Sequence, residues 1–225
     1  NGRAHHSKEI YQVLPWIEKL GFDQLNIDLI AGMIGETWDT WRDSVKKTID
    51  IAPHSVTIYQ MELPFNTVYS KDYLGGRFHV PIADWQTKRA WHEYAFDELA
   101  AAGYEISSAY TMVKKGSNAR FVYRDSVWHG CDMLGTGVAS FGHMNGVHIQ
   151  NADGWDQYVD SIAHNQLPLA RAFTTEKSER LIREMILQMK LGAIEPSYFQ
   201  EKFGKNIVSE FGSAFRKLED AGMLQ

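Results

Sequence analysis

Cysteine is nearly absent from this sequence of 225 residues, which contains only Cys131. A single cysteine excludes an internal disulfide bond, because such a bond joins two cysteines. It also excludes an iron–sulfur cluster held by this chain alone, since these clusters take about three or four thiolate ligands. Any chemistry that needs a cluster therefore needs ligands from elsewhere.

Long apolar runs are absent as well. No stretch approaches the roughly 18 apolar residues of a membrane-spanning helix, and the polar start NGRAHHSKE lacks the apolar segment of a signal peptide. We therefore expect a cytoplasmic protein with no membrane partner. Because the first residue is not methionine and lies beside a predicted helix, we also expect a fragment of a longer protein.

The chain has no excess of basic residues. It contains 23 lysines and arginines against 28 aspartates and glutamates, a formal net charge of −5. Nucleic-acid-binding proteins normally present a basic face, so we expect no nucleic-acid partner. With 44% apolar and 23% charged residues, the composition is that of a globular protein with one good core and a smaller second domain.

One acid stands out in the stretch NIDLIAGMIGET at residues 26–37, which predicts a strand, a glycine turn and a helix start. In a strand, Asp28 points to the same face as Asn26 and away from Leu29. A carboxylate in a buried strand needs a partner, because an unsatisfied buried polar group costs about 2 to 7 kcal/mol. Two interpretations remain equally open: a ligand contact at the sheet edge, or an internal hydrogen bond.

The first 112 residues alternate between helical and strand patterns, which favours an α/β fold with parallel strands. A loop at residues 65–83 is long enough to be a lid. The predicted helices run from Ser7 to Gly21, Thr37 to Pro53 and Asp84 to Gly103, and the predicted strands cover residues 25–31, 55–63 and 104–112.

The second half breaks this alternation. Residues 121–129 show no clear period, and the glycine-rich segment 133–143 predicts a strand with close backbone packing. A short helix follows Asp153. From Pro168 onward the pattern is purely helical, and its three helices resemble the front of a winged-helix domain.

Several polar residues are further candidates for a site. Gln60 and Glu62 follow the second strand, near the same edge as Asp28. The glycines of GMIG at residues 32–35 fit a tight turn better than a phosphate loop, because no full phosphate-binding pattern is present. His129, Cys131, His143 and His148 have no recognised metal-ligand spacing, so packing or solvent-facing roles are the simpler interpretation. For the seven tryptophans we expect core packing.

Read together, these segments resemble a known family. Arg3 and His5 before the first helix, then NIDLIAG, YQMELP, GYEI, LGTGVASF and ARAFTTEKSERLIREMILQMKLG, occur in the order seen in oxygen-independent coproporphyrinogen III oxidases. These are radical S-adenosylmethionine enzymes, and the resemblance covers nearly the whole chain. It implies the second half of an incomplete β/α barrel with parallel strands at residues 1–112, a sheet extension at 113–167 and a helical winged-helix-like domain at 168–225.

The resemblance also implies a cofactor site. It assigns Arg3 and Asp28 to S-adenosylmethionine contacts and places Tyr59, Met61 and Glu62 along the cofactor pocket. An arginine fork suits a carboxylate, and an aspartate accepts hydrogen bonds from hydroxyls or an amine. The implied reaction is the oxidative decarboxylation of porphyrinogen propionates in haem or chlorophyll biosynthesis.

The chain departs from the family pattern at three places. The CxxxCxxC motif is absent, so the ligands of the [4Fe–4S] cluster are expected in a missing N-terminal half of the same protein. GMI replaces the usual GLP after the strand, and Ala109 and Tyr110 stand where acidic residues and histidine are frequent. An alternative for this tetrapyrrole-binding chain is therefore a haem chaperone or a haem-utilisation relative without oxidase activity.

Overall fold

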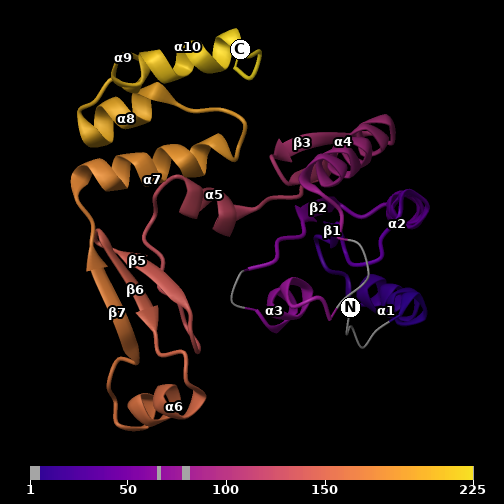
Figure 1. Cartoon of the computed structure of the whole chain (residues 1–225), viewed down its shortest axis with the longest axis horizontal. Helices are drawn as coiled ribbons and strands as arrows, with labels where there is room; N and C mark the ends of the chain where they lie inside the picture. The colour runs from indigo at the N-terminus through magenta and orange to yellow at the C-terminus, as the bar shows by residue number, and fades with distance from the viewer. Residues whose placement is uncertain (1–5, 65–66, 78–81, 225) are drawn as a thin grey trace. The chain divides into compact units, whose positions relative to one another are not determined.

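The chain forms two compact units, at residues 1–120 and 121–225, each with its own apolar core (Figure 1). The structure is a computed structural model that describes residues 6–64, 67–77 and 82–224. The first unit contains α1 (Ser7–Leu20), β1 (Asn26–Ala31), α2 (Trp38–Ile51), β2 (Ser55–Gln60), α3 (Val68–Leu74), α4 (Trp85–Ala101), β3 (Tyr104–Ser108) and β4 (Thr111–Lys114).

The sheet of the first unit has the strand order β1-β2-β4-β3. β1 and β2 are parallel, as predicted, but β4 is antiparallel to both β2 and β3. The single parallel strand predicted for residues 104–112 is therefore wrong. The chain turns back between Ser108 and Thr111, where the Ser108 hydroxyl accepts a hydrogen bond of 3.2 Å from the Tyr110 amide and closes the turn without glycine or proline.

Helices α2 and α4 cover one face of this sheet with apolar side chains. Val56 and Ile58 of β2 are fully buried there, together with residues from both helices. Trp41 of α2 stacks near Trp91 of α4, and its Nε1 atom donates a hydrogen bond of 2.8 Å to the Trp91 carbonyl oxygen. The indole is thus buried with its polar atom satisfied, which fixes the two helices against each other.

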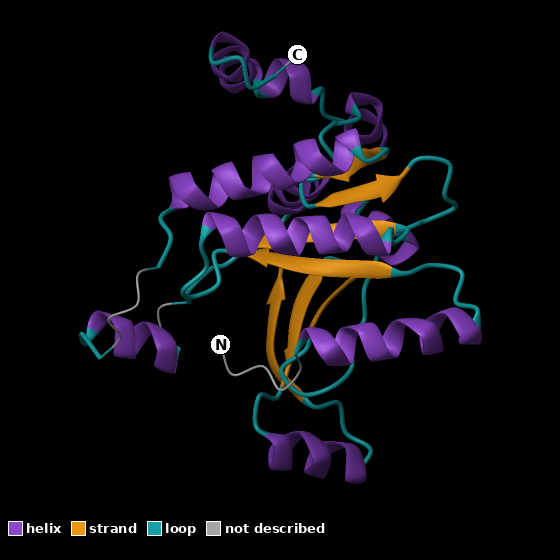
Figure 2. Cartoon of the chain, turned by 90° about the vertical axis from the view of Figure 1, so that its right-hand side faces the viewer, coloured by secondary structure: helices purple, strands orange, loops and turns teal. Residues whose placement is uncertain are grey.

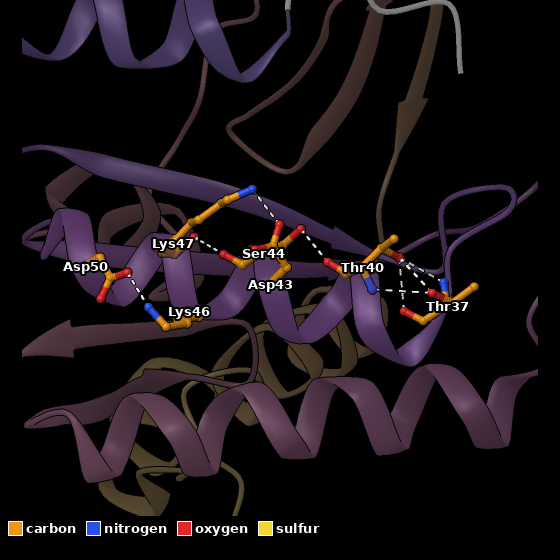
Figure 3. A network of polar contacts seen from close by, with 8 residues as sticks. Thr37, Thr40, Asp43, Ser44, Lys46, Lys47 and Asp50 are labelled. Carbon is orange, nitrogen blue, oxygen red and sulfur yellow. Dashed lines mark hydrogen bonds and ion pairs between the residues drawn. The ribbon is translucent and has the colours of Figure 1, made fainter.

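The start of α2 is capped as the sequence predicts (Figure 3). The Thr37 hydroxyl accepts a hydrogen bond from the Thr40 amide, and the Thr40 hydroxyl accepts one from the Thr37 amide. Farther along the same helix, Lys47 pairs with Asp43 one turn earlier. The cap fixes where the turn after β1 ends and α2 begins.

Helix α1 forms where predicted and ends at Gly21 in the left-handed conformation, with φ of 66°. Its apolar stripe is not buried, however, and Leu20 is 72% exposed. The predicted loop 65–83 contains the short helix α3, capped by the Thr67 side chain. Residues 65–66 and 78–81 of that loop lie outside the described residues.

The second unit contains a sheet of β5 (Phe141–Met144), β6 (Val147–Asn151) and β7 (Leu169–Thr174) in that order, with antiparallel pairing. Its helices lie before, between and after these strands along the chain, and Figure 2 colours the helices of the protein purple and the strands orange. A two-residue turn with positive φ at both Asn145 and Gly146 joins β5 to β6, which is the usual geometry of a tight hairpin. Its elements are α5 (Val122–Trp128), β5 (Phe141–Met144), β6 (Val147–Asn151), α6 (Trp155–Ala163), β7 (Leu169–Thr174), α7 (Lys177–Met189), α8 (Pro196–Phe203), α9 (Ile207–Glu210) and α10 (Gly212–Asp220).

Two predictions for this unit are wrong. Residues 169–174 form strand β7 rather than part of a helical segment. All six side chains of this strand are exposed, so the strand has no buried apolar face. The predicted strand 133–143 is mostly a loop that folds back, with a bridge between Met133 and His143. Its close backbone packing is real, because a Cβ atom on Gly135 would lie 2.1 Å from the Phe141 carbonyl oxygen.

The helices of the second unit pack around Leu181, Phe199, Phe203 and Ile207. Helix α7 leaves several of its apolar side chains partly exposed. Its Ile182, Ile186 and Met189 are about half exposed, whereas Glu184 and Gln188 are buried. Within the described part of the chain, no helix is both long and apolar enough to cross a membrane.

Candidate functional site

A polar network covers the face of the first sheet opposite to α2 and α4. Its centre is Asn26 of β1, whose Oδ1 atom accepts hydrogen bonds from the hydroxyls of Ser55, at 2.8 Å, and Thr57, at 3.2 Å. The Thr57 hydroxyl lies 3.4 Å from that of Thr111 on β4. The network therefore spans three strands and gives hydrogen-bond partners to the buried hydroxyls of Ser55, Thr57 and Thr111, whereas Asn26 is exposed.

Asp28 lies on this polar face and is exposed, so the premise of a buried acid is wrong. Only the other face of β1, with Leu29, packs against the core. The Asp28 Oδ1 atom accepts a hydrogen bond of 2.7 Å from the side-chain Nδ2 atom of Asn26. This hydrogen bond orients the Asp28 carboxylate. Because the carboxylate is exposed, it can accept further hydrogen bonds from a ligand.

Tyr59 comes from the neighbouring strand to the same face. It pairs with Ile30 in the register of β1 and β2, and its ring is 47% exposed and stacks near Tyr110, with the ring centres 6.4 Å apart. Partial burial and the negative charge of Asp28 both raise the pKa of Tyr59. The structure thus brings Asp28 and Tyr59 together, and adds Tyr110, which the sequence had not assigned to a site.

Met61 and Glu62 follow β2 at the edge of the same sheet. The Met61 amide donates a hydrogen bond of 2.8 Å to the Ala31 carbonyl, and its own carbonyl accepts one of 2.8 Å from Lys88. Glu62 is exposed, and its charge acts on Lys88. Burial has the larger effect, so the pKa of Lys88 is lowered. Met61 therefore contributes to this edge through its backbone.

Lys88 is a positioning residue that the sequence did not indicate. It is only 5% exposed on α4 and resembles any surface lysine in the sequence. Its side chain crosses above Gly32, where a Cβ atom would lie 2.7 Å from the lysine Cε atom. Gly32 has φ of 95°, a conformation that favours glycine. Gly32 is thus required both by backbone geometry and by the lysine.

The turn after β1 is closed by a carboxylate. Glu36 accepts hydrogen bonds from the amides of Gly32, at 2.6 Å, and Met33, at 3.1 Å. Burial raises the pKa of Glu36, and these two hydrogen bonds oppose that shift. Because Glu36 occupies the amides that a phosphate would need, the structure agrees with a tight turn at GMIG.

Arg3 lies outside the described residues. The histidines and the cysteine of the second unit, for which the sequence favours packing or solvent-facing roles, do not gather into one group. His143 is buried beside His148, with the ring centres 4.5 Å apart, whereas His129 and Cys131 are exposed. Among the residues that the structure describes, no group of three or more histidine, cysteine, aspartate or glutamate side chains is arranged to hold a metal ion.

The chain is similar to two kinds of curated protein. It is 23% identical to the haem chaperone HemW of Bacillus subtilis, over 99% of this chain and 58% of that protein. It is 22% identical to the oxygen-independent coproporphyrinogen III oxidase of Synechocystis, over 92% of this chain and 46% of that protein. The chain is thus a relative of the oxygen-independent coproporphyrinogen III oxidase family. The predicted resemblance is confirmed.

The fold points the same way. Coproporphyrinogen III oxidase (HemN) from Escherichia coli, described as a radical SAM enzyme, matches 98% of this chain and 52% of its own, with a TM-score of 0.76 and 16% identity. The mixed α/β fold of the HemN protein is therefore present. The chain spans about half the length of the curated relatives it matches. None of the known family models matches the chain.

The family implies two bound groups, S-adenosylmethionine and a [4Fe–4S] cluster, and the residues of this chain suit the first but not the second. S-adenosylmethionine carries an amine, hydroxyls and an adenine ring, and the polar face offers an exposed carboxylate at Asp28 and an exposed aromatic ring at Tyr59. A [4Fe–4S] cluster does not fit, because Cys131 is the single cysteine of the sequence and lies in the second unit.

Proposed function

We propose that this chain is the C-terminal part of a radical S-adenosylmethionine enzyme that acts on a tetrapyrrole. The observation that carries the proposal is the exposed Asp28 carboxylate, held by Asn26 on a polar sheet face beside Tyr59. Matches to coproporphyrinogen III oxidases support the substrate class. The reaction proposed is the oxidative decarboxylation of porphyrinogen propionates, with the cluster held by cysteines outside this sequence.

In this proposal each residue has a binding task. Asp28 accepts hydrogen bonds from the cofactor's hydroxyls or amine, and Tyr59 provides a face for its adenine ring. Met61 and Glu62 line the adjoining edge, and Arg3 provides a fork for the cofactor carboxylate. When bound at a reduced cluster, the cofactor supplies the radical chemistry of the reaction. The parallel strands of the first unit belong to an incomplete β/α barrel, and the last helices to a winged-helix-like domain.

The cofactor site is tested by equilibrium dialysis of the chain with labelled S-adenosylmethionine. We expect saturable binding that Asp28→Asn weakens about tenfold, since hydrogen bonds to a charged group contribute about 1.5 to 3 kcal/mol. Asp97→Asn, at an exposed aspartate on α4, is the matched control and leaves binding unchanged. An Asp28→Asn variant that binds as well as the parent chain overturns the assignment.

The reaction is tested anaerobically, with reductant and coproporphyrinogen, on a chain that also carries the cluster-binding half. Release of carbon dioxide with consumption of S-adenosylmethionine supports the oxidase. Consumption of the cofactor without loss of a carboxyl group rejects it and indicates a different radical reaction.

A second candidate function is haem delivery, which the similarity to HemW proteins favours. His129, Cys131 and His148 are the exposed candidates for an axial ligand, whereas His143 is buried. Titration with haemin tests this function through the Soret band. A band that is the same in the His129→Ala, Cys131→Ala and His148→Ala variants as in the parent chain removes these three residues from consideration.

A further inference from the structure

A small polar pocket of about 220 Å³ lies within the second unit, whereas Asp28 belongs to the first unit. One wall is the inner face of α7, where Lys177, Arg180 and Glu184 follow one another at helical spacing. The other walls are the segment after α5, the hairpin turn of β5 and β6, and the end of α8. They contribute Gly130, Asp132, His143, Asn145, Gly146, Lys202 and Phe203.

The backbone is fitted closely around the charged groups of this pocket. Gly130 has φ of 75°, and a Cβ atom there would lie 2.4 Å from the carboxyl carbon of Glu184. Gly146 has φ of 76°, and a Cβ atom there would lie 3.0 Å from Arg180. The Thr175 hydroxyl donates a hydrogen bond of 2.6 Å to the Gly146 carbonyl, which ties the hairpin turn to the start of α7.

The buried acid of the pocket already has its partners. The Glu184 side chain is only 4% exposed and forms an ion pair of 2.9 Å with Lys202. The Tyr198 hydroxyl donates a hydrogen bond of 2.5 Å to the same carboxylate. Burial and the charge of Glu184 raise the pKa of Tyr198, so the phenol keeps its proton. The Glu184 carboxylate thus has its own partners and does not neutralise the other cations of the pocket, Lys177 and Arg180.

Three buried nitrogen atoms at and beside the pocket have no such partner. They are Nε of Arg180, Nη1 of Arg183 and Nδ1 of His143, which form no hydrogen bond within the described part of the chain. His143 as a residue is 3% exposed. Each buried unsatisfied group destabilises the folded state, so a fold that keeps three of them requires an explanation.

The charges of the pocket select the kind of ligand. Among the lining residues, Lys177, Arg180 and Lys202 carry three positive charges, and Asp132 and Glu184 carry two negative ones. One positive charge remains, which matches a carboxylate better than a doubly charged phosphate. The volume is below the ~300 Å³ at which pockets for drug-sized ligands begin, so a whole macrocycle does not fit.

We propose that this pocket binds one propionate carboxylate of a tetrapyrrole through Arg180 and Lys177, with the macrocycle outside it. The proposal rests on the proposed function for its substrate class. Arginine holds a carboxylate through two parallel hydrogen bonds, which suits the orientation of a flexible side arm. The pocket thereby selects tetrapyrroles by their acidic arms.

The experiment follows the imidazole signals of the chain by NMR during titration with sodium propionate and, separately, with inorganic phosphate. We expect saturable shifts at His143 with propionate, and about tenfold weaker binding in Arg180→Gln because the bidentate contact is lost. Arg216→Gln, at an exposed arginine on α10, is the matched control and binds as the parent does. Lys177→Met, at an exposed position, weakens binding by about threefold and keeps the test valid if Arg180→Gln does not fold.

Each outcome has a defined meaning. If neither anion gives a saturable shift, or if Arg180→Gln and Lys177→Met bind like the parent, the pocket is not an anion site. If phosphate binds more tightly than propionate, the carboxylate assignment is wrong.

Coproporphyrin added next separates this proposal from the proposed function. Displacement of propionate supports both. Binding of coproporphyrin without displacement rejects the pocket as its propionate site and leaves the tetrapyrrole function standing. Propionate binding without any coproporphyrin binding retains a carboxylate pocket and rejects the tetrapyrrole.

Discussion

The Nζ atom of Lys88 donates a hydrogen bond of 2.8 Å to the Met61 carbonyl oxygen and so joins α4 to the segment that follows β2. Replacing Lys88 with methionine keeps the aliphatic stem but leaves this carbonyl without its donor. We expect the free energy of unfolding to fall by about 1 to 2 kcal/mol, measured by urea denaturation.

Lys46→Met is the matched control for that variant. Lys46 is exposed and pairs with Asp50 at the surface, so we expect its urea midpoint to match that of the parent. A Lys88→Met variant as stable as Lys46→Met would show that the buried hydrogen bond contributes nothing.

Gly32 and Lys88 are coupled by close approach. Gly32→Ala forces a Cβ atom to within 2.7 Å of the Lys88 Cε atom and also strains a φ of 95°. We expect the free energy of unfolding to fall by about 2 to 3 kcal/mol. Adding Lys88→Ala to the same chain should restore part of this loss, because it removes the overlap with the new Cβ atom. Strict additivity in this double-mutant cycle would argue against the contact. Gly21→Ala, where φ is 66° and no atom lies within 4 Å of the added carbon, reports the backbone strain alone.

Glu184 stabilises the second unit through Tyr198 and Lys202. Glu184→Ala removes the ion pair with Lys202 and the hydrogen bond from Tyr198, although the Tyr198 hydroxyl still reaches the His129 carbonyl oxygen. We expect a loss of about 2 to 3 kcal/mol in the free energy of unfolding, since Lys202 is partly exposed. Glu201→Ala, at an exposed glutamate on α8, should leave the urea midpoint unchanged. Equal midpoints for the two variants would contradict a structural role for the buried carboxylate.

His143 should make the stability of the second unit depend on pH. Burial, Arg183 and His148 lower its pKa below the ordinary 6.5, and Asp132 and Glu184 oppose the shift. Between the folded pKa and 6.5 the unfolded chain therefore binds more protons than the folded chain, so stability falls as the pH drops through 6.5.

The measurement is the urea midpoint at pH 7 and pH 5, in a buffer without carboxylate or phosphate. His143→Gln should lose less stability between these two values than the parent, whereas His164→Gln, at an exposed histidine, should behave as the parent. A pH dependence that is the same in all three chains would place its origin elsewhere.

Tyr59 should contribute to cofactor affinity through its ring. Tyr59→Ala is expected to weaken S-adenosylmethionine binding about threefold to tenfold, because aromatic pairs contribute about 0.5 to 1.5 kcal/mol beyond burial. Tyr59→Phe keeps the ring and should retain most of the affinity. Tyr123→Ala, in the second unit and 72% exposed, is the control. Loss of binding in Tyr59→Phe equal to that in Tyr59→Ala would assign the effect to the hydroxyl instead.

The sequence predicted the elements whose local signals agree with their packing. Thr37 marks the start of α2, and Gly21 the end of α1, because cap residues act within one turn of the chain. The β1 and β2 strands were found because one face of each is continuously apolar. The role of Asp28 came from the family resemblance, whereas its exposure and its hydrogen bond to Asn26 came from the structure.

The sequence did not predict the features that depend on contacts between residues far apart in the chain. The turn at Ala109 and Tyr110 has no glycine or proline, so β3 and β4 looked like one strand. Lys88 is buried by its reach toward Met61, which no pattern on α4 indicates. One missed signal was available, however. Asn145-Gly146 between apolar residues is a strong hairpin signal and would have located β5 and β6.

The hairpin of β5 and β6 and the parallel pair of β1 and β2 differ in how far apart their partners lie along the chain. Met144 pairs with Val147 across a two-residue turn, whereas Asn26 pairs with Ser55 and the whole of α2 lies between them in the chain. Closing a short loop is faster than closing a long one, so the hairpin beside the carboxylate pocket gains its structure early in folding. The polar network around Asn26 joins residues of both β1 and β2, so the proposed cofactor site is complete only once this longer closure has been made.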